Sequence, residues 1–494
     1  MAAAKGRPRL ERVATHVPGL DTILCGGLLR GGIYVVRGAP GSGKTILGNQ
    51  ISFANARQGG NSAYVTLLAE SHARLMLHLE SIDFYDPALV GEGVRYLSAY
   101  NVLIKSGLRG VLDFIRSELP PKHRSKGKKT SADPANIIVI DGFLVISEFS
   151  SSVGELKKFI QDLQLYADLV GATVLLLAGP AVDESRPEYT MVDGIIELRE
   201  HVHDLRAYRE LRVRKLRGVP HLRGGHIFDI SHRGIRVYPR VEALYGTPSG
   251  EDRCSDSTVS SGIPQLDRML GGGMKCGTTT LVLGPSGAGK TTLGLHYLAA
   301  TPKGSRSVLF GFYETPSRLL EKARKLNLRL DSRLKRGDLE FVWQPSTEQN
   351  VDALVERLLQ AVDRNSATRL FIDGLDGFQR ATIHPERVHH VFTAIANELR
   401  IRGVTTLYTF EVPKFIGPSF DSPVTGVSAL AENLIYLRFV ELRSHLYRLL
   451  PVLKVRDSSY DSSLREFHIT SDGIRLEKTF ESAEAILTGT AITR

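Results

Sequence analysis

Two segments of this chain combine glycines with a lysine and a threonine at a spacing that can hold a phosphate. They read GAPGSGKT from Gly38 and GPSGAGKT from Gly284, and both match the pattern G-x-x-x-x-G-K-[ST]. Glycines are needed because successive backbone N–H groups must turn toward one phosphate through conformations that a Cβ would obstruct. The positive end of the helix that follows points at the same phosphate. The two segments therefore predict two nucleotide-binding sites.

The residues of these segments have expected roles in binding ATP and Mg²⁺. The ammonium groups of Lys44 and Lys290 are expected to reach the β- and γ-phosphates, and the hydroxyl groups of Thr45 and Thr291 to bind Mg²⁺. The other nucleotide contacts expected in the two segments are Gly41, Ser42, Gly43, Ile46, Gly287, Ala288, Gly289 and Thr292.

An aspartate ends a short apolar segment in each half of the chain. Asp141 follows residues 137–140, and Asp373 follows residues 370–372. An acid at the end of a buried strand beside a phosphate loop can hold Mg²⁺ through water. The alternative is an aspartate that caps the next helix. Its recurrence in both halves favours the metal role for Asp141 and Asp373.

A glutamate follows the second apolar segment of each half. Hydrolysis of ATP needs a carboxylate that orients or activates the attacking water. Glu70 and Glu314 stand in that place. A glutamate after a strand is more often an acid at a helix N-terminus, but its occurrence at the equivalent position in both halves favours a catalytic role.

These motifs belong to an internal repeat. Residues 17–45 and 263–291 align without a gap at a constant offset, since 290 − 44 = 246. After them, short apolar segments alternate with helical patterns in both halves, which indicates an α/β fold with a mostly parallel sheet covered by helices on both faces. We expect a first domain over residues 1–245, a polar linker over 246–258 and a second domain over 259–494.

The composition limits the classes of protein that fit. The formal net charge of +10 permits contact with nucleic acid or acidic surfaces without requiring it. The three cysteines, Cys25, Cys254 and Cys276, form no C-x-x-C pair, so neither a zinc ribbon nor a disulfide framework is expected. No apolar run approaches the roughly 18 residues that span a bilayer, and no secretory signal is recognisable. We therefore expect a cytoplasmic protein without a membrane partner.

The motifs and their flanking residues together resemble the KaiC family, the double-domain RecA-like ATPases of the bacterial circadian clock and their non-clock relatives. The resemblance covers nearly the whole chain and includes the leucine–aspartate and glycine–glycine pairs ahead of each loop. It implies two tandem RecA-like P-loop NTPase domains and a homohexameric ring with nucleotides between the subunits.

The resemblance also assigns a basic segment that follows each sheet. Residues 215–221 are similar to the family's K-x-R-G-x-x-H segment, and residues 454–460 to its second-domain counterpart. In the family these side chains reach the γ-phosphate bound by the neighbouring subunit. Taken without the family, two cations on an edge strand are equally a solvated pair. The residues implied are Lys215, Arg217, Lys454 and Arg456 as catalytic groups, and His221, Ser458 and Tyr460 as nucleotide contacts.

This chain departs from the family's pattern in three places. The family's first domain has two adjacent glutamates where Ala69 and Glu70 stand, and the second domain here has Tyr313 before its own glutamate. The family's Ser-Thr autophosphorylation pair falls on Ser428 and an alanine, so a two-site phosphorylation cycle is not expected, and phosphorylation of Ser428 stays open. In the second basic segment, Asp457 replaces a glycine, and a tyrosine replaces the histidine.

Two functions from different classes follow. The first is a Mg-ATP-dependent ring ATPase, with serine autokinase activity open, that signals its nucleotide state to a KaiB-like or other signalling protein. The regulatory tail of the clock proteins is expected to be absent or short. The alternative is a DNA-acting recombinase or helicase, which only the net charge and the basic stretch 122–129 support. No helix-turn-helix pattern and no basic segment with interleaved aromatic residues favours nucleic acid as a partner.

Overall fold

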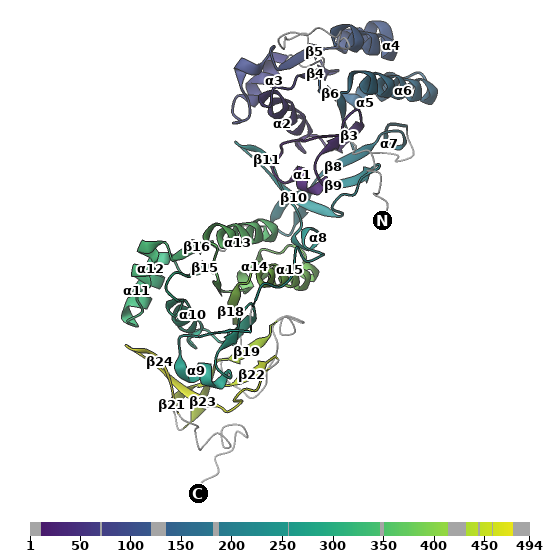
Figure 1. The fold of residues 1–494 in the computed structure, drawn as a ribbon. Coiled ribbons are helices and arrows are strands. Elements are labelled where there is room, and N and C mark those ends of the chain that lie inside the picture. Colours follow the sequence, from purple (N-terminus) through teal and green to yellow (C-terminus); the bar gives the residue numbers. More distant parts are fainter. Residues whose placement is uncertain are drawn as a thin grey trace, which may run out of the picture. The chain divides into compact units, whose positions relative to one another are not determined.

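The computed structural model describes residues 11–69, 72–119, 135–180, 187–254, 256–345, 350–412, 431–442, 445–456 and 458–477. The chain divides into two compact units, Met1–Ala243 and Leu244–Arg494. The same arrangement of a sheet between helices recurs in both (Figure 1). The linker expected over residues 246–258 stays a prediction.

A nine-stranded sheet forms the centre of the first unit, in the order β11-β10-β9-β8-β3-β7-β6-β4-β5. The strands from β8 to β5 run parallel, and β9 to β11 continue the sheet antiparallel. The strands are β3 (Ile33–Gly38), β4 (Ser62–Thr66), β5 (Val94–Ser98), β6 (Ile137–Asp141), β7 (Thr173–Ala178), β8 (Gly194–His203), β9 (Arg206–Leu216), β10 (Gly225–Ser231) and β11 (Gly234–Tyr238). Every residue of β3, β4, β6 and β7 is buried, as expected for apolar parallel strands covered on both faces.

Helices cover both faces of this sheet. α2 packs against β4, β6 and β7 from one side, and α5 contacts β7 from the other side beside α4. The predicted apolar positions of α6, namely Leu156, Phe159, Ile160 and Leu163, are all buried. The remaining elements are β1 (Arg12–Val13), α1 (Leu20–Ile23), β2 (Leu28–Leu29), α2 (Lys44–Arg57), α3 (His72–Leu79), η1 (Pro87–Leu89), α4 (Tyr100–Glu118), α5 (Phe143–Phe149), α6 (Val153–Val170), α7 (Pro187–Thr190) and α8 (Val241–Leu244).

The second unit repeats the core of the first. Its seven-stranded sheet has the order β16-β15-β17-β18-β14-β19-β22, and only β22 is antiparallel to its neighbour. The order from β16 to β19 matches that from β5 to β8 in the first unit, which confirms the predicted fold class. The strands are β14 (Thr279–Gly284), β15 (Ser307–Gly311), β16 (Leu339–Trp343), β17 (Arg369–Asp373), β18 (Thr405–Glu411), β19 (Asn433–Tyr436) and β22 (Val452–Val455).

A separate four-stranded sheet, β20-β21-β23-β24, completes the second unit. The predicted apolar face of α15, formed by Phe392, Ile395 and Leu399, is buried. The remaining elements are β12 (Thr258–Val259), α9 (Pro264–Met269), β13 (Met274–Lys275), α10 (Lys290–Ala299), α11 (Pro316–Lys325), α12 (Leu330–Arg336), α13 (Val351–Asn365), α14 (Asp376–Arg380), η2 (Pro385–Arg387), α15 (Val388–Ile401), β20 (Arg438–Leu442), β21 (His445–Leu450), β23 (Arg465–Thr470) and β24 (Gly473–Leu476).

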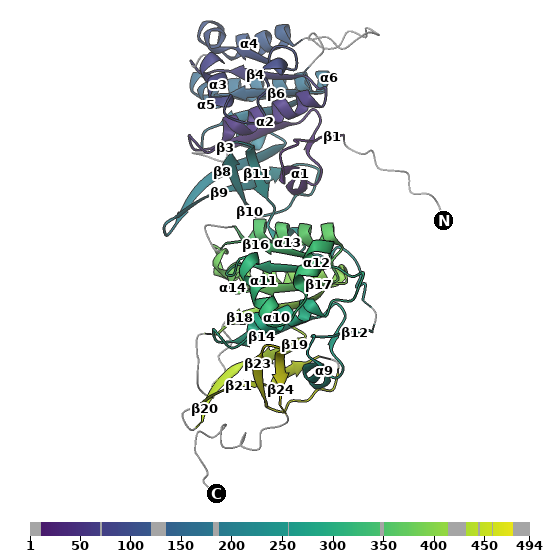
Figure 2. The same cartoon turned by 90° about the vertical axis from the view of Figure 1, so that its left-hand side faces the viewer.

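The strands β8 and β9 form a long hairpin that extends beyond the neighbouring strands of the first unit (Figure 2). Its tip carries two apolar side chains in water: Val202 is 75% exposed and Leu205 is 99% exposed. Among the helices in the described ranges, none has the length and the apolar character needed to cross a bilayer.

Two cysteines of the second unit lie in contact. The thiol of Cys276 donates to Sγ of Cys254 at 2.8 Å, and both thiols are free. Burial and this hydrogen bond raise the pKa of Cys254 to about 12. Cys25, in the first unit, is exposed.

We expect iodoacetamide to alkylate Cys25 at least ~10-fold faster than Cys254 near neutral pH, because only a thiolate is nucleophilic. The raised pKa keeps Cys254 protonated, so its alkylation rate should keep rising with pH up to about 12. Timed alkylation of the native protein followed by peptide mass spectrometry measures both rates. Alkylation of the unfolded chain should abolish the difference, and equal rates in the native protein would contradict the contact between the two thiols.

Candidate functional site

Each glycine-rich loop connects a buried strand to the helix that begins at the predicted lysine: β3 leads into α2, and β14 into α10. The residues ahead of the helices, Gly43 and Gly289, have φ angles of 98° and 109°. A Cβ on Gly43 would lie 2.7 Å from Cδ1 of Ile230, so both backbone and space require glycine there. By contrast, a Cβ on Gly41 or Gly287 would meet nothing within 4 Å. These two glycines border open space that a phosphate can occupy.

The loop lysines fold back over their own loops. Nζ of Lys44 donates to the carbonyl oxygens of Gly38 and Ala39, at 2.7 and 2.8 Å. Nζ of Lys290 makes the same two bonds to the first two residues of its loop, at 2.7 and 2.8 Å. Burial lowers the pKa of both lysines. Each ammonium group is thus held at the loop, where it can neutralise a phosphate oxygen.

The predicted Mg²⁺ residues of each unit are in contact. Oγ1 of Thr45 donates to Oδ2 of Asp141 at 3.1 Å, and Oγ1 of Thr291 donates to Oδ2 of Asp373 at 3.0 Å. Both aspartates end strands, and neither is the N-cap of the helix that follows. Their carboxylates therefore point to the threonines of the loops rather than capping helices.

Each aspartate accepts a second hydroxyl that sequence reasoning missed. Oη of Tyr64 donates to Oδ2 of Asp141 at 2.5 Å, and Oγ1 of Thr409 donates to Oδ1 of Asp373 at 2.8 Å. Burial, followed by the charge of the aspartate, raises the pKa of Tyr64 well above its ordinary value, so the phenol keeps its proton and donates. No signal in the sequence sets these two residues apart, because β4 and β18 each contain other hydroxyl side chains.

The oxygen atoms in these clusters suit Mg²⁺, which prefers hydroxyl and carboxylate ligands. Across the described ranges, no three or more His, Cys, Asp or Glu side chains gather where they could hold a metal by themselves. One carboxylate and one hydroxyl are typical of a Mg²⁺ site that is completed by water and by the phosphates of the substrate. The residues present therefore fit the ion.

The strand registers place Glu70 and Glu314 at different distances along the chain from the end of the preceding strand. Thr66 and Gly311 lie opposite the aspartates that end β6 and β17, so these two residues correspond. Glu314 follows Gly311 by 314 − 311 = 3 residues, whereas Glu70 follows Thr66 by 70 − 66 = 4 residues. The segment between the strand end and the glutamate is thus one residue longer in the first unit, and the equivalence of Glu70 and Glu314 stays a prediction. Glu70 itself lies outside the described residues.

Glu314 lies near the pair formed by Thr291 and Asp373 in the second unit. Its Oε1 accepts a bond from Nζ of Lys322 on α11 at 2.8 Å, and its side chain is 32% exposed. Burial raises the pKa of Asp373, and the charge of Glu314 raises it further. Glu411, at the end of β18, lies 3.9 Å from Nζ of Lys290. The second unit thus gathers a lysine and three acids at one edge of its sheet.

The first basic segment is bonded to its own chain. Nζ of Lys215 and the guanidinium of Arg217 donate to the carbonyl oxygens of residues 189–191, at 2.8–3.3 Å. Burial lowers the pKa of Lys215 and of His221. These contacts go to backbone carbonyls and not to the glycine-rich loop of the first unit.

The second basic segment is more exposed. Nζ of Lys454 donates to the carbonyl oxygen of Ala431 at 2.8 Å. Arg456, Ser458 and Tyr460 are exposed, and the phenol of Tyr460 donates to the backbone at 3.1 Å. Asp457 and the phosphorylation candidate Ser428 lie outside the described residues.

The remaining predicted contacts lie in the loops or in the first turns of α2 and α10, and their side chains turn inward. Ser42, Ala288 and Thr292 are at most 5% exposed, and Ile46 packs against the apolar core of the first unit. These residues can therefore offer a phosphate only their backbone N–H groups.

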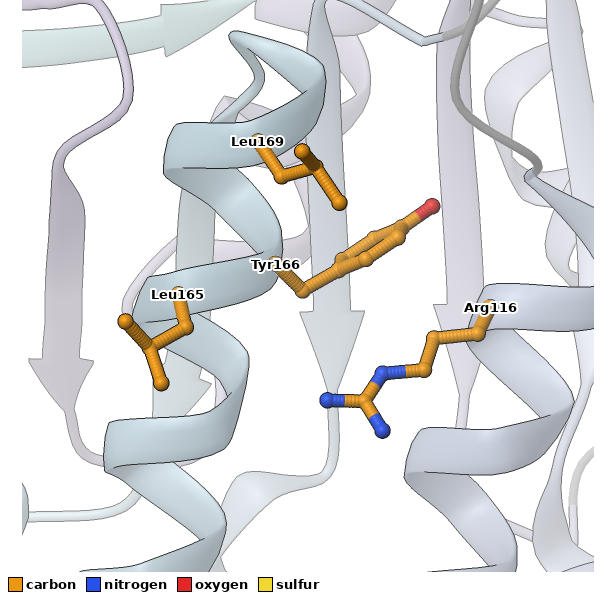
Figure 3. A pocket seen from close by; sticks show the side chains of 4 residues that line it. All are labelled: Arg116, Leu165, Tyr166 and Leu169. Atoms are coloured by element: carbon orange, nitrogen blue, oxygen red, sulfur yellow. The ribbon is translucent and has the colours of Figure 1, made fainter.

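A pocket of about 280 Å³ lies apart from the loops, between α4 and α6. Figure 3 shows the ring of Tyr166 pointing from α6 toward α4, with Arg116 beside it and Leu165 and Leu169 along α6. The Tyr166 phenol donates to the carbonyl oxygen of Leu119 at the end of α4. None of the predicted site residues lines this pocket.

Comparison with known proteins identifies the family. A family model described as the KaiC ATPase matches residues 13–242 and 259–480. The chain belongs to the KaiC ATPase family. The KaiC family accounts for the duplicated sheet and for an ATP-binding loop in each unit.

Several circadian clock oscillator proteins named KaiC match almost the whole chain. The protein of Picosynechococcus sp. is 24% identical over 488 residues, 97% of this chain and 92% of that protein. That of Parathermosynechococcus lividus is 24% identical over 504 residues, 99% of this chain and 89% of that protein. That of Prochlorococcus marinus is 22% identical over 502 residues, 99% of this chain and 97% of that protein. The KaiC likeness is thus extensive in length and low in identity.

Removing each loop lysine should empty one site at a time. Calorimetric titration with a non-hydrolysable ATP analogue and Mg²⁺ should give two sites for the native chain, one for Lys44→Ala or Lys290→Ala, and none for the double variant. The loss of a charge-assisted hydrogen bond should weaken binding at the affected site by roughly 10- to 100-fold. Lys335→Ala, an exposed lysine on α12, serves as the control. Two sites of native affinity in the double variant would contradict the assignment.

Proposed function

We propose that this KaiC-family ATPase binds Mg-ATP at both loops, assembles into a ring and hydrolyses ATP chiefly at its second unit. The observation that carries the division of labour is the position of Glu314 near Asp373, whereas Glu70 stands one residue farther along the chain from the end of its strand. Both units have the lysine and the threonine–aspartate pair that nucleotide binding needs.

In the proposed binding mode, the backbone N–H groups of each loop surround the β-phosphate, and Lys44 or Lys290 neutralises the β- and γ-phosphate oxygens. The positive ends of α2 and α10 add to this attraction. Thr45 with Asp141, and Thr291 with Asp373, would hold Mg²⁺. When bound, that ion offsets the negative charge that develops on the phosphate oxygens.

In the proposed hydrolysis, Glu314 accepts a proton from a water molecule whose oxygen attacks the γ-phosphorus. The bond between that phosphorus and the β,γ-bridging oxygen breaks, and ADP and inorganic phosphate leave. The ion pair of Glu314 with Lys322 at 2.8 Å orients the carboxylate near Asp373.

We propose a ring because the basic segments carry cations that the loops of their own units do not use. Lys215 and Arg217 bond to backbone, and Arg456 is exposed. Across a subunit interface, such cations would stabilise the charge on the neighbour's γ-phosphate. The exposed Val202 and Leu205 at the hairpin tip also favour burial against another chain.

Autokinase activity and signalling extend this proposal. The hydroxyl of Ser428 would replace water as the nucleophile, so its oxygen would gain the γ-phosphoryl group, and the proton would pass to Glu314. The family resemblance alone supports this step. The ring would then report its nucleotide or phosphorylation state to a KaiB-like or other signalling protein.

Replacement of Glu314 tests the division of labour. We expect Glu314→Gln to lower ATP turnover about 100-fold, because the general base is lost, with little change in nucleotide affinity. Glu70→Gln should have a smaller effect. Phosphate release and calorimetry measure turnover and affinity, and Glu321→Gln, an exposed acid on α11, is the matched control. Native turnover in Glu314→Gln would overturn the proposal.

Mixed assemblies test whether Arg456 acts on a neighbour. Arg456→Ala and Glu314→Gln homo-oligomers should each be nearly inactive, whereas co-assembled subunits should regain part of the activity, because some interfaces then combine native partners. Native mass spectrometry reports assembly in parallel. Monomers with and without nucleotide would refute the ring, and turnover stimulated by DNA at low salt would favour the recombinase or helicase alternative.

A further inference from the structure

The two units hold their strand-end aspartates with hydroxyl groups that arrive from opposite sides. In the first unit, Tyr64 on β4 donates to Asp141, which ends β6. In the second unit, Thr409 on β18 donates to Asp373, which ends β17. In the first sheet β6 lies between β4 and β7, and in the second sheet β17 lies between β15 and β18. Because β4 corresponds to β15 and β7 to β18, the two donors lie on opposite sides of the strand that carries the aspartate.

The strand registers show that each hydroxyl donor is replaced by a leucine at the corresponding position of the other unit. Tyr64 lies opposite the residue two positions before Asp141, and Leu309 lies opposite the residue two positions before Asp373, so Tyr64 and Leu309 correspond. Leu177 and Thr409 correspond in the same way through their pairing with β3 and β14. The first unit therefore has its hydroxyl on β4 and its leucine on β7, whereas the second unit has its leucine on β15 and its hydroxyl on β18.

All four side chains of this exchange are buried, at 2% exposure or less. A buried hydroxyl without a partner is costly, and a hydrogen bond to a carboxylate is stronger than one between neutral groups. In the first unit the bonds from Thr45 and Tyr64 both fall on Oδ2 of Asp141. In the second unit the two threonines use both oxygens of the aspartate.

Neighbouring residues hold Tyr64 in place. Its ring packs against that of Tyr96 on β5, with centroids 5.4 Å apart. The phenol of Tyr96 donates to Oδ1 of Asn49 at 2.7 Å, and Asn49 donates to the carbonyl oxygen of Thr45 at 2.8 Å. The corresponding residues of the second unit, Phe341 and Leu295, cannot make these bonds. The polar cluster around Tyr64 thus belongs to the first unit.

We propose that Tyr64 is a positioning residue for Mg-nucleotide in the first unit: its hydroxyl fixes the Asp141 carboxylate with Oδ2 engaged and leaves Oδ1 for the water of the cation. Thr409 does the equivalent work for Asp373 from the other side. This inference rests on the proposed function, because it assumes that the strand-end aspartates serve Mg²⁺.

The test measures the affinity of a fluorescent ADP analogue in a Lys290→Ala background, which leaves the first unit as the only binding site. Tyr64→Phe should weaken binding in the presence of Mg²⁺ by roughly 10-fold, as expected for one hydrogen bond to a charged group, and change it less than about 2-fold in EDTA. Adding Leu177→Thr should restore most of the loss, because a hydroxyl then arrives from the side that the second unit uses.

Two matched variants separate positioning from packing. Tyr34→Phe removes a buried phenol of the same unit that accepts from the backbone of Leu29 and does not contact Asp141, so it should leave the Mg²⁺ dependence unchanged. Thr409→Val in a Lys44→Ala background should reproduce the loss at the second unit. Thermal unfolding of the nucleotide-free variants reports their stability, and equal weakening with and without Mg²⁺ would overturn the positioning role.

The same titrations distinguish this inference from the function it rests on. If the Lys290→Ala protein binds the ADP analogue equally well in Mg²⁺ and in EDTA, the proposed metal site fails. If it binds in a Mg²⁺-dependent manner and Tyr64→Phe behaves like the parent, the inference about Tyr64 fails alone. Should Tyr64→Phe not fold, Thr409→Val still tests whether a second hydroxyl on the aspartate governs Mg²⁺ dependence.

Discussion

Both candidate sites depend on buried parallel strands that end at one edge of a sheet. β3 and β14 are each enclosed by parallel neighbours, so the loop that follows starts from a fixed backbone. Because parallel strands end at the same edge, the aspartates of β6 and β17 come to the first threonines of α2 and α10. The glycines can then turn N–H groups toward a phosphate without moving the acids that accompany it.

The sequence was enough to predict features whose cause is local. Spacing alone indicated both loops, and apolar segments with a terminal acid indicated β6 and β17. What the sequence could not supply concerns relations between distant strands. Glu70 and Glu314 were predicted to be equivalent, and the strand registers show only that the segment before Glu70 is one residue longer. The role of Tyr64 could not be predicted from the sequence, because its bond to Asp141 depends on the pairing of strands whose bonded residues lie 77 positions apart.

Duplication has preserved the backbone of the KaiC fold while the buried polar groups have diverged. Arg37 and Glu197, on neighbouring strands of the first unit, form a buried ion pair at 3.0 Å. The corresponding residues of the second unit are Leu283 and Tyr436, which carry no charge. Loss of one member of a buried pair strands the other charge in the core, so such pairs are replaced together or not at all. The two units are therefore not interchangeable in chemistry, although their strand orders agree.

The buried pair has a mechanical consequence. Arg37 directly precedes the first glycine of the loop, and Glu197 belongs to β8, whose antiparallel partner β9 leads into the basic segment at Lys215. The strand pair β8 and β9 thus joins the glycine-rich loop to the segment that the proposed ring would present to its neighbour. A displacement of the loop on nucleotide exchange would then move β8 and β9, and with them the basic segment at the proposed interface. The nucleotide state of one subunit would in this way affect its neighbour through the sheet.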